Sequence, residues 1–252
     1  MHVEFRLQLG QQSSILEIRM RGYTMENYSS KKIILSEMNV PAGSEEIFEK
    51  ISNLRELLLT YNSAIREVTT KLEILNDELS VRNRRNPIQF IKSRVKTPMS
   101  IVDKLQKLEK EISVESVMTS LNDVAGIRVI ASFVDDVYEI ADMLTKQDDV
   151  FLIEAKDYIK NPKPNGYRSY HLIVEVPVFF SDKKQFVRVE IQIRTVAMDF
   201  WASLEHQLKY KENIKNSEEI EAELRQCAET IANTDMKMMS IRNKIGDKYK
   251  SI

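Results

Sequence analysis

Residues 187–194 read Val187-Arg188-Val189-Glu190-Ile191-Gln192-Ile193-Arg194, with an apolar side chain at every odd-numbered position. Successive side chains of a β-strand point to opposite faces, so this spacing predicts a strand with one apolar and one polar face. The apolar face belongs against a hydrophobic core. The polar face has two interpretations, a solvated surface of the sheet or the floor of an active site.

Further apolar runs predict the rest of a sheet. We expect strands over 126–133, 151–159, 169–179 and 186–195, and the last two should form a hairpin. Residues 134–145, between the first two strands, have the apolar spacing of a crossover helix. The sequence therefore predicts an α+β fold, a mixed sheet of four to five strands flanked by helices.

Long helices are predicted on both sides of this region. Apolar residues recur at alternating spacings of four and three, which predicts helices over 44–80 and 218–245. We expect the first of these to pack mainly on the domain itself. The second is expected to form a subunit interface, and packing against the first helix is the alternative. Shorter helices are expected over 98–110 and 201–211.

The N-terminal part of the chain has a different pattern. Residues 1–43 show no sustained periodicity, and we expect them to form a loosely ordered tail. A short helix around 15–20 is the alternative. Residues 44–252 are then expected to form a single domain that includes both long helices.

The overall composition narrows the class of protein. The 37 basic and 38 acidic residues give a net charge of -1, which argues against a protein that coats nucleic acid. Only six glycines and six prolines favour long helices over an all-β fold with many turns. One cysteine, and no Cys/His cluster with zinc-ligand spacing, fit a reducing compartment. No apolar run approaches the roughly 20 residues that span a bilayer, so a cytoplasmic location is expected.

Positive charge is concentrated in residues 81–96. This segment has six basic side chains and no acidic one: Arg82, Arg84, Arg85, Lys92, Arg94 and Lys96. Such a concentration in a nearly neutral chain indicates an anion-binding site, and an ordinary solvated face is the alternative.

Two carboxylates are candidates for a metal site. Asp123 directly precedes the apolar run that should form a central strand, and Glu190 lies on the polar face of another. Two carboxylates from neighbouring strands can hold Mg²⁺, which prefers oxygen ligands and keeps sites for substrate phosphates. A single aspartate before a strand is also a common turn or cap residue.

The segment 161–169 is a loop rich in Pro, Asn and Gly. It places Lys163 and Arg168 beside Tyr167, and this combination suits a nucleotide, with the ring stacked on a base and the cations on phosphates. In that case the loop should be poorly ordered until nucleotide binds, and the ring face should matter more than the hydroxyl. The alternative is an ordinary loop whose tyrosine packs on the sheet.

Five blocks of sequence occur in a recognisable order. They are RVKTPMSI at 94–101, LNDVAGIRV at 121–129, PNGYRSYH at 164–171, VEIQIRT at 189–195 and MDFWASLEH at 198–206. Together they resemble the synthetase domain of the RelA/SpoT family, and more closely its small alarmone synthetases of the RelP/RelQ type. The resemblance runs from about residue 44 to about residue 245.

The resemblance implies a fold and an activity. It implies a nucleotidyltransferase-like fold and an enzyme that transfers the β,γ-pyrophosphate of ATP to the 3′-hydroxyl of GDP or GTP, releasing AMP and making (p)ppGpp. It also implies a synthetase without hydrolase activity, Mg²⁺ as cofactor and a homotetramer. No membrane and no obligatory nucleic-acid partner are expected.

The family's site residues carry over where the blocks match. By resemblance, Asp123 and Glu190 are the Mg²⁺ ligands, and Glu190 is also the general base. The implied ATP-binding residues are Arg94, Lys96, Ser100, Lys104, Lys107 and Arg128. The implied GDP- or GTP-binding residues are Lys163, Tyr167, Arg168, His171, Gln192 and Asp199.

Two positions depart from the family pattern. Tyr170 replaces the usual leucine, and because it shares strand parity with Leu172 it should face the core. Asp199 stands where relatives can carry asparagine, at a position that reads guanine.

Two other functions remain open at this stage. A relative on the same scaffold could pyrophosphorylate the 3′ end of tRNA, although the near-neutral charge argues against an RNA-binding surface. The chain could also be a non-catalytic helical interaction module, although the presence of both Asp123 and Glu190 argues against a decayed site.

Overall fold

The computed structural model describes residues 6–8, 15–17, 44–83, 85–209 and 217–250. The chain divides into two compact units, Met1–Ile51 and Ser52–Ile252. In the first unit, strands β1 (Arg6–Gln8) and β2 (Ile15–Glu17) pair in antiparallel register.

The alternative of a helix around 15–20 is wrong for the part that the structure describes, because 15–17 form strand β2. Residues 18–20 and most of the other residues of 1–43 lie outside the described residues. The loosely ordered tail and the single domain over 44–252 therefore stay predictions.

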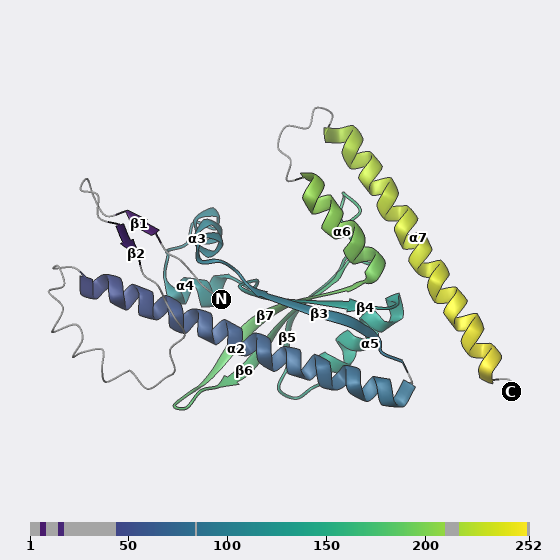
Figure 1. Ribbon diagram of the computed structural model, residues 1–252, viewed down its shortest axis with the longest axis horizontal. Helices are drawn as coiled ribbons and strands as arrows, with labels where there is room; N and C mark the ends of the chain where they lie inside the picture. The colour runs from purple at the N-terminus through teal and green to yellow at the C-terminus, as the bar shows by residue number, and fades with distance from the viewer. Residues whose placement is uncertain (1–5, 9–14, 18–43, 84, 210–216, 251–252) are drawn as a thin grey trace. The chain divides into compact units, whose positions relative to one another are not determined.

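The second unit contains a five-stranded mixed sheet (Figure 1). Its strands, in the order β3-β4-β7-β6-β5, are β3 (Ile88–Val95), β4 (Ala125–Ala131), β7 (Lys184–Thr195), β6 (Tyr170–Phe179) and β5 (Phe151–Asp157). β4 and β7 are parallel, and the other neighbouring pairs are antiparallel. The mixed sheet and the β6–β7 hairpin confirm the prediction, whereas β3 is a strand that the sequence analysis missed.

The alternation in β7 has the predicted outcome. Val187, Val189, Ile191 and Ile193 are buried in the core cluster, together with Ile127 and Val129 of β4. Tyr170 of β6 also packs against this cluster, as its strand parity predicts. The apolar face of the sheet therefore packs in the hydrophobic core. The polar face carries the side chains that could form an active site.

Helices complete this unit. They are α2 (Ser44–Asn83), α3 (Pro98–Lys107), α4 (Val114–Ser120), α5 (Val134–Thr145), α6 (Val196–Lys209) and α7 (Ser217–Lys250). The apolar stripe of α2 enters the core through Tyr61, Val68 and Leu72, which confirms its packing on the domain. α4 was not predicted, and α6 begins five residues earlier than expected. Of the helices that the structure describes, none is long and apolar enough to cross a membrane.

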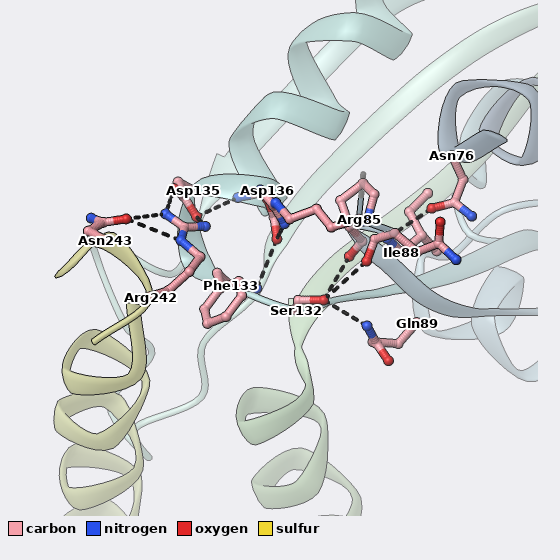
Figure 2. Close-up of polar contacts among 12 residues, drawn as sticks. Asn76, Arg85, Ile88, Gln89, Ser132, Phe133, Asp135, Asp136, Arg242 and Asn243 are labelled. Carbon is pink, nitrogen blue, oxygen red and sulfur yellow. Dashed lines mark hydrogen bonds and ion pairs between the residues drawn. The ribbon is translucent and has the colours of Figure 1, made fainter. Parts of the chain in front are cut away.

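Two arginines fasten distant segments to the start of α5. Figure 2 shows Arg85, which follows α2, reaching the buried Asp136, while Arg242 of α7 reaches the neighbouring Asp135. The guanidinium of Arg242 also lies 4.5 Å from the ring centre of Phe133. Arg85 of the basic segment therefore stabilises the fold, whereas Lys92 and Arg94 lie on β3 and Lys96 directly follows it.

Candidate active site

The strand register assembles a row of polar side chains across the sheet. Arg128 of β4 lies opposite Lys92 of β3 and Gln192 of β7, and Gln192 lies opposite His171 of β6. Residues that pair across neighbouring strands project from the same face. The next row runs from Arg94 through Gly126 to Glu190. Gly126 has no side chain, and the side chain of Arg94 lies over it, with its Cγ atom 3.7 Å from where a Cβ atom of residue 126 would stand.

Asp123 lies just before β4 and is held by two lysines. Its carboxylate is 2.6 Å from the Nζ atom of Lys96, at the end of β3, and 2.6 Å from that of Lys104, on α3. Burial alone would raise the pKa of Asp123, but the hydrogen bonds and charges of Lys104 and Lys96 outweigh it and the pKa is lowered. Asp123 is therefore ionised at neutral pH.

Arg188 anchors the segment that carries Asp123. Its Nη1 atom donates to the Oδ1 atom of Asn122 at 3.1 Å and to the carbonyl of Thr119 at 3.2 Å. The alternation had placed Arg188 on the polar face without indicating a role. Its role is to connect β7 to the segment that precedes β4.

Glu190 lies at the centre of the polar face. Its carboxylate is 3.4 Å from the Nδ1 atom of His171 and accepts a hydrogen bond of 3.1 Å from the Nε2 atom of Gln192. Burial alone would raise the pKa of Glu190, but the contacts with His171 and Gln192 outweigh it and the pKa is lowered. The charge of Asp123 acts in the opposite direction, which places the two carboxylates within electrostatic reach of each other.

This pair of carboxylates fits a divalent cation. Both groups are ionised and repel each other, and Mg²⁺ binds through one or two carboxylates plus substrate phosphates. Within the described part of the chain, no group of three or more His, Cys, Asp and Glu side chains converges as a metal centre. A metal bound here would therefore depend on a substrate for its remaining ligands.

Tyr167 lies at the far end of the polar face, and it is half-buried. Its hydroxyl is 2.8 Å from the Nε2 atom of His171 and accepts a hydrogen bond of 2.6 Å from Arg194. The ring of His171 thus lies between Tyr167 and Glu190, with its Nε2 atom toward the tyrosine hydroxyl and its Nδ1 atom toward the carboxylate. The tyrosine hydroxyl is therefore engaged, unlike in the sequence-based hypothesis, which gave a role only to the ring.

Cations surround the ring of Tyr167. The Nζ atom of Lys163 is 4.9 Å from the ring centre, and the guanidinium of Arg194 is 5.1 Å from it. The ring of Tyr158 packs edge-on at 6.0 Å. Aromatic rings beside cations are the usual platform for a nucleobase and its phosphates.

Arg194 is the site residue that the sequence analysis missed. Its side chain is only 5% exposed. Besides Tyr167, it donates to the Oε1 atom of Gln192 at 2.7 Å and to the Oδ1 atom of Asp199 at 3.1 Å. The alternating pattern placed Arg194 on the polar face, but the contact with Asp199 depends on how α6 folds back over β7.

Asp199 contacts two arginines of the site, Arg194 and Arg128. The oxygen that contacts Arg194 is also 3.2 Å from Arg128, an expected ATP ligand. Burial and the charge of Arg194 lower the pKa of Arg128, while Asp199 acts against that shift. Asp199 therefore screens two arginines from each other, in addition to any contact that it makes with a base.

Among the expected ligands that the structure describes, Ser100, Lys107 and Arg168 make no hydrogen bond or ion pair with Asp123 or Glu190. Ser100 contacts the hydroxyl of Thr97 at the start of α3, and Lys107 is exposed on the last turn of that helix. Arg168 turns away from Tyr167, since its Nη1 atom donates to the carbonyls of Gly166 and Ala228. The structure does not bring Arg168 to the polar face of the sheet.

Comparison with known proteins agrees with the geometry of this site. Residues 93–215 match a family described as a region found in RelA/SpoT proteins. The chain is 43% identical over 188 residues to the GTP pyrophosphokinase YwaC of Bacillus subtilis, a match that covers 75% of this chain and 90% of that protein. This chain belongs to the RelA/SpoT family.

Solved structures place the chain among the small alarmone synthetases of the RelA/SpoT family. Small alarmone synthetase 1 from Bacillus subtilis, bound to its product pppGpp, is 34% identical, with a TM-score of 0.69 over 76% of this chain and 97% of that one. The same synthetase bound to AMPCPP is 30% identical, with a TM-score of 0.63 over 77% and 98% of the two chains. The resemblance stated from the five sequence blocks is confirmed.

Proposed function

We propose that this chain synthesises (p)ppGpp by transferring the β,γ-pyrophosphate of ATP to the 3′-hydroxyl of GDP or GTP, with release of AMP. One observation carries the proposal: two ionised carboxylates lie between a side rich in lysine and arginine and a side built around Tyr167. The first we call the donor side and the second the acceptor side.

The donor side suits the triphosphate of ATP. Arg94, Lys96, Lys104 and Arg128 supply positive charge next to Asp123 and Glu190. Phosphoryl-type transfer needs alignment and charge neutralisation more than covalent chemistry, and these side chains provide both. Ser100 and Lys107 on α3 are proposed as further contacts to ATP.

The acceptor side suits a guanine nucleotide. We assign base stacking to Tyr167 and further contacts to Lys163, His171 and Gln192. Asp199 could accept hydrogen bonds from the guanine edge, in competition with its two arginines. Arg168 is assigned to the support of the loop and not to a direct contact.

Glu190 is proposed as the general base. It is ionised and pairs across the sheet with Gly126, over which the side chain of Arg94 lies. Glu190 takes the proton of the 3′-hydroxyl, whose oxygen forms a bond to the β-phosphorus of ATP. The bond between that phosphorus and the oxygen bridging to the α-phosphate breaks, and this oxygen leaves with AMP.

Asp123 and Glu190 would hold Mg²⁺. When bound, the ion would neutralise phosphate oxygens of ATP. Lys96 and Lys104, which contact Asp123, are placed to turn toward those same phosphates.

Assembly and location are further proposals. Met236, Met238, Ile241 and Ile245 of α7 are exposed apolar side chains, which fits a helix that contacts other subunits. We propose a cytoplasmic homotetramer with nucleotide substrates and no membrane partner. Sedimentation of the purified protein tests the oligomeric state.

The activity is tested by incubating purified protein with ATP labelled in its γ-phosphate, together with GDP, GTP or tRNA. We expect labelled guanosine products and one AMP per product, with no label in tRNA. Label transferred to tRNA alone would favour the alternative pyrophosphokinase. No transfer to any acceptor, in a protein that is folded, would favour a non-catalytic interaction module.

A further inference from the structure

The loop 161–169 rests directly on α7. Gly166 has a φ of +90°, a conformation that other residues rarely adopt. A Cβ atom added to it would lie 2.6 Å from the Cβ atom of Ala228 and 3.3 Å from the Cα atom of Arg225, both on α7. A side chain at position 166 would therefore clash with Ala228, and the glycine lets the loop pack on this turn of α7.

Arg168, which follows Tyr167 in the sequence, adds a second contact between the loop and α7. Its Nη1 atom donates to the carbonyl of Gly166 at 3.1 Å and to that of Ala228 at 3.2 Å. One guanidinium therefore ties the loop to the same turn of α7 that Gly166 touches. The guanidinium of Arg168 therefore binds backbone carbonyls in this structure.

α7 is itself fixed at this level. The indole Nε1 atom of Trp201 on α6 donates to the carbonyl of Leu224 at 2.9 Å, one turn before Ala228. Two turns after Ala228, the buried carboxyl of Asp235 contacts the hydroxyl of Thr195, the residue that follows Arg194. The loop thus rests on a helix that is anchored to the end of β7.

Other contacts already shape the loop. Gly166 donates its N–H to the carbonyl of Lys163 at 2.8 Å, and the amide of Asn165 donates to Glu205 of α6 at 3.0 Å. The sequence had suggested a loop that orders only when nucleotide binds. These contacts hold the loop against α6 and α7, and its order before nucleotide binds stays a prediction.

We propose that α7 supports the loop 161–169 and thereby positions Tyr167 for the guanine nucleotide. Ala228 and Arg168 are the positioning residues. The inference rests on the proposed function, since it assigns a support to the acceptor side of that site. Tyr167 lies between Gly166 and Arg168, so a shift of this contact moves the ring. The donor side shares no residue with it.

Enlarging Ala228 is the direct test, and α7 offers a matched control. Ala228→Leu adds bulk where Gly166 packs, whereas Ala222→Leu makes the same change at an exposed position two turns earlier. Overpacking at Ala228 should push the loop away and raise the KM for GDP at least about fivefold. The KM for ATP should stay close to wild type, and Ala222→Leu should behave as wild type throughout. The Tm of Ala228→Leu should fall by several degrees, because overpacking a buried position destabilises the fold.

A second variant covers the case in which Ala228→Leu disturbs the whole helix. Arg168→Met keeps most of the side-chain length, removes both hydrogen bonds and leaves Ala228 unchanged. It should also raise the KM for GDP and spare that for ATP. If neither variant weakens GDP selectively, the inference is overturned.

The single tryptophan supplies a readout that is independent of turnover. Trp201 lines a small cavity with Gly166, Arg168 and Ala228, so its fluorescence should respond to GDP and much less to an ATP analogue. Absorption by the nucleotide is corrected with free tryptophan. In Ala228→Leu, a higher GDP concentration should be needed for the same fluorescence change. A GDP titration identical to that of wild type would contradict the proposal that α7 positions the loop. A wild-type protein that shows this response without forming product would instead contradict the proposed function.

Discussion

On the donor side of the sheet, Lys104 and Arg128 have partly exposed side chains, whereas on the acceptor side Arg194 is held within a closed network. The side chains of Lys104 and Arg128 are 37% and 38% exposed, while that of Arg194 is 5% exposed. Lys104 contacts one carboxylate, but Arg194 contacts a tyrosine, a glutamine, a serine and an aspartate. On the donor side, positive charge is thus accessible to the phosphates of a substrate. On the acceptor side, the charge of Arg194 is already neutralised by Asp199.

This difference suggests a division of labour between binding by charge and binding by shape. A partly exposed lysine such as Lys104 can leave Asp123 and follow the phosphates of ATP with little reorganisation of the fold. A buried arginine that fixes Tyr167 provides a rigid platform before any ligand arrives, and such preorganisation lowers the entropic cost of binding. Substitutions on the two sides should therefore have different consequences.

Glu190→Gln, between the two sides, should have the largest effect. The change keeps the size and removes the charge of the proposed base, so kcat should fall by at least about 10²-fold. The KM for ATP should also rise, because Glu190 is a proposed Mg²⁺ ligand, whereas the KM for GDP should change much less. Steady-state kinetics check this, with Glu139→Gln on the exposed face of α5 as the control. Near-normal turnover would remove Glu190 from the mechanism.

Tyr167→Phe should have an intermediate effect, restricted to the acceptor. It keeps the ring but removes the hydrogen bonds to Arg194 and His171. Each such bond contributes about 0.5–1.5 kcal/mol, so the KM for GDP should rise about three- to tenfold. Tyr170→Phe, on the core side of β6, is the matched control. An unchanged KM would show that only the ring face matters.

Asp235→Asn should have the smallest effect, on stability alone. Burial raises the pKa of Asp235, and its hydrogen bond with Thr195 offsets only part of that. A carboxyl with a raised pKa in the folded state stabilises the fold at low pH and loses that contribution as pH rises above its unfolded value near 3.8. The asparagine variant avoids this loss, so its Tm at neutral pH should equal or exceed wild type by about 2–4 °C.

Thermal melts at several pH values check whether the Tm of Asp235→Asn lies above or below that of wild type. The difference between Asp235→Asn and wild type should shrink as pH falls. A variant that melts lower than wild type at neutral pH would mean that the ionised carboxyl is needed where α7 meets β7.

The sequence predicts the donor side better than the acceptor side. Alternation in β7 identified the polar face, and the position of Asp123 before an apolar run indicated a carboxylate at the edge of the sheet. Strand β3 was missed because its basic side chains hid a partly buried edge strand, whose pattern has only one fully buried position. Charge density was interpreted as a binding segment, although Arg85 serves the fold through Asp136.

The acceptor network depends on contacts between segments that are distant in the sequence. Arg194 meets Ser169 from another strand and Asp199 from a helix, and no local spacing encodes these partners. Arg168 was assigned to the nucleotide because it is a cation beside Tyr167. Its true partner, the carbonyl of Ala228, lies 60 residues away and is visible only once α7 is docked.

The division between the two sides is tested most directly by one pair of variants measured against both nucleotides. Lys104→Met and Tyr167→Ala are compared for the KM values of ATP and GDP, with Lys146→Met on the surface of α5 as the control for lost charge. Lys104→Met should raise the KM for ATP about 10- to 100-fold, and Tyr167→Ala should raise that for GDP about 5- to 150-fold, each sparing the other nucleotide. If both variants weaken both nucleotides alike, the donor and acceptor sides are not separate sites.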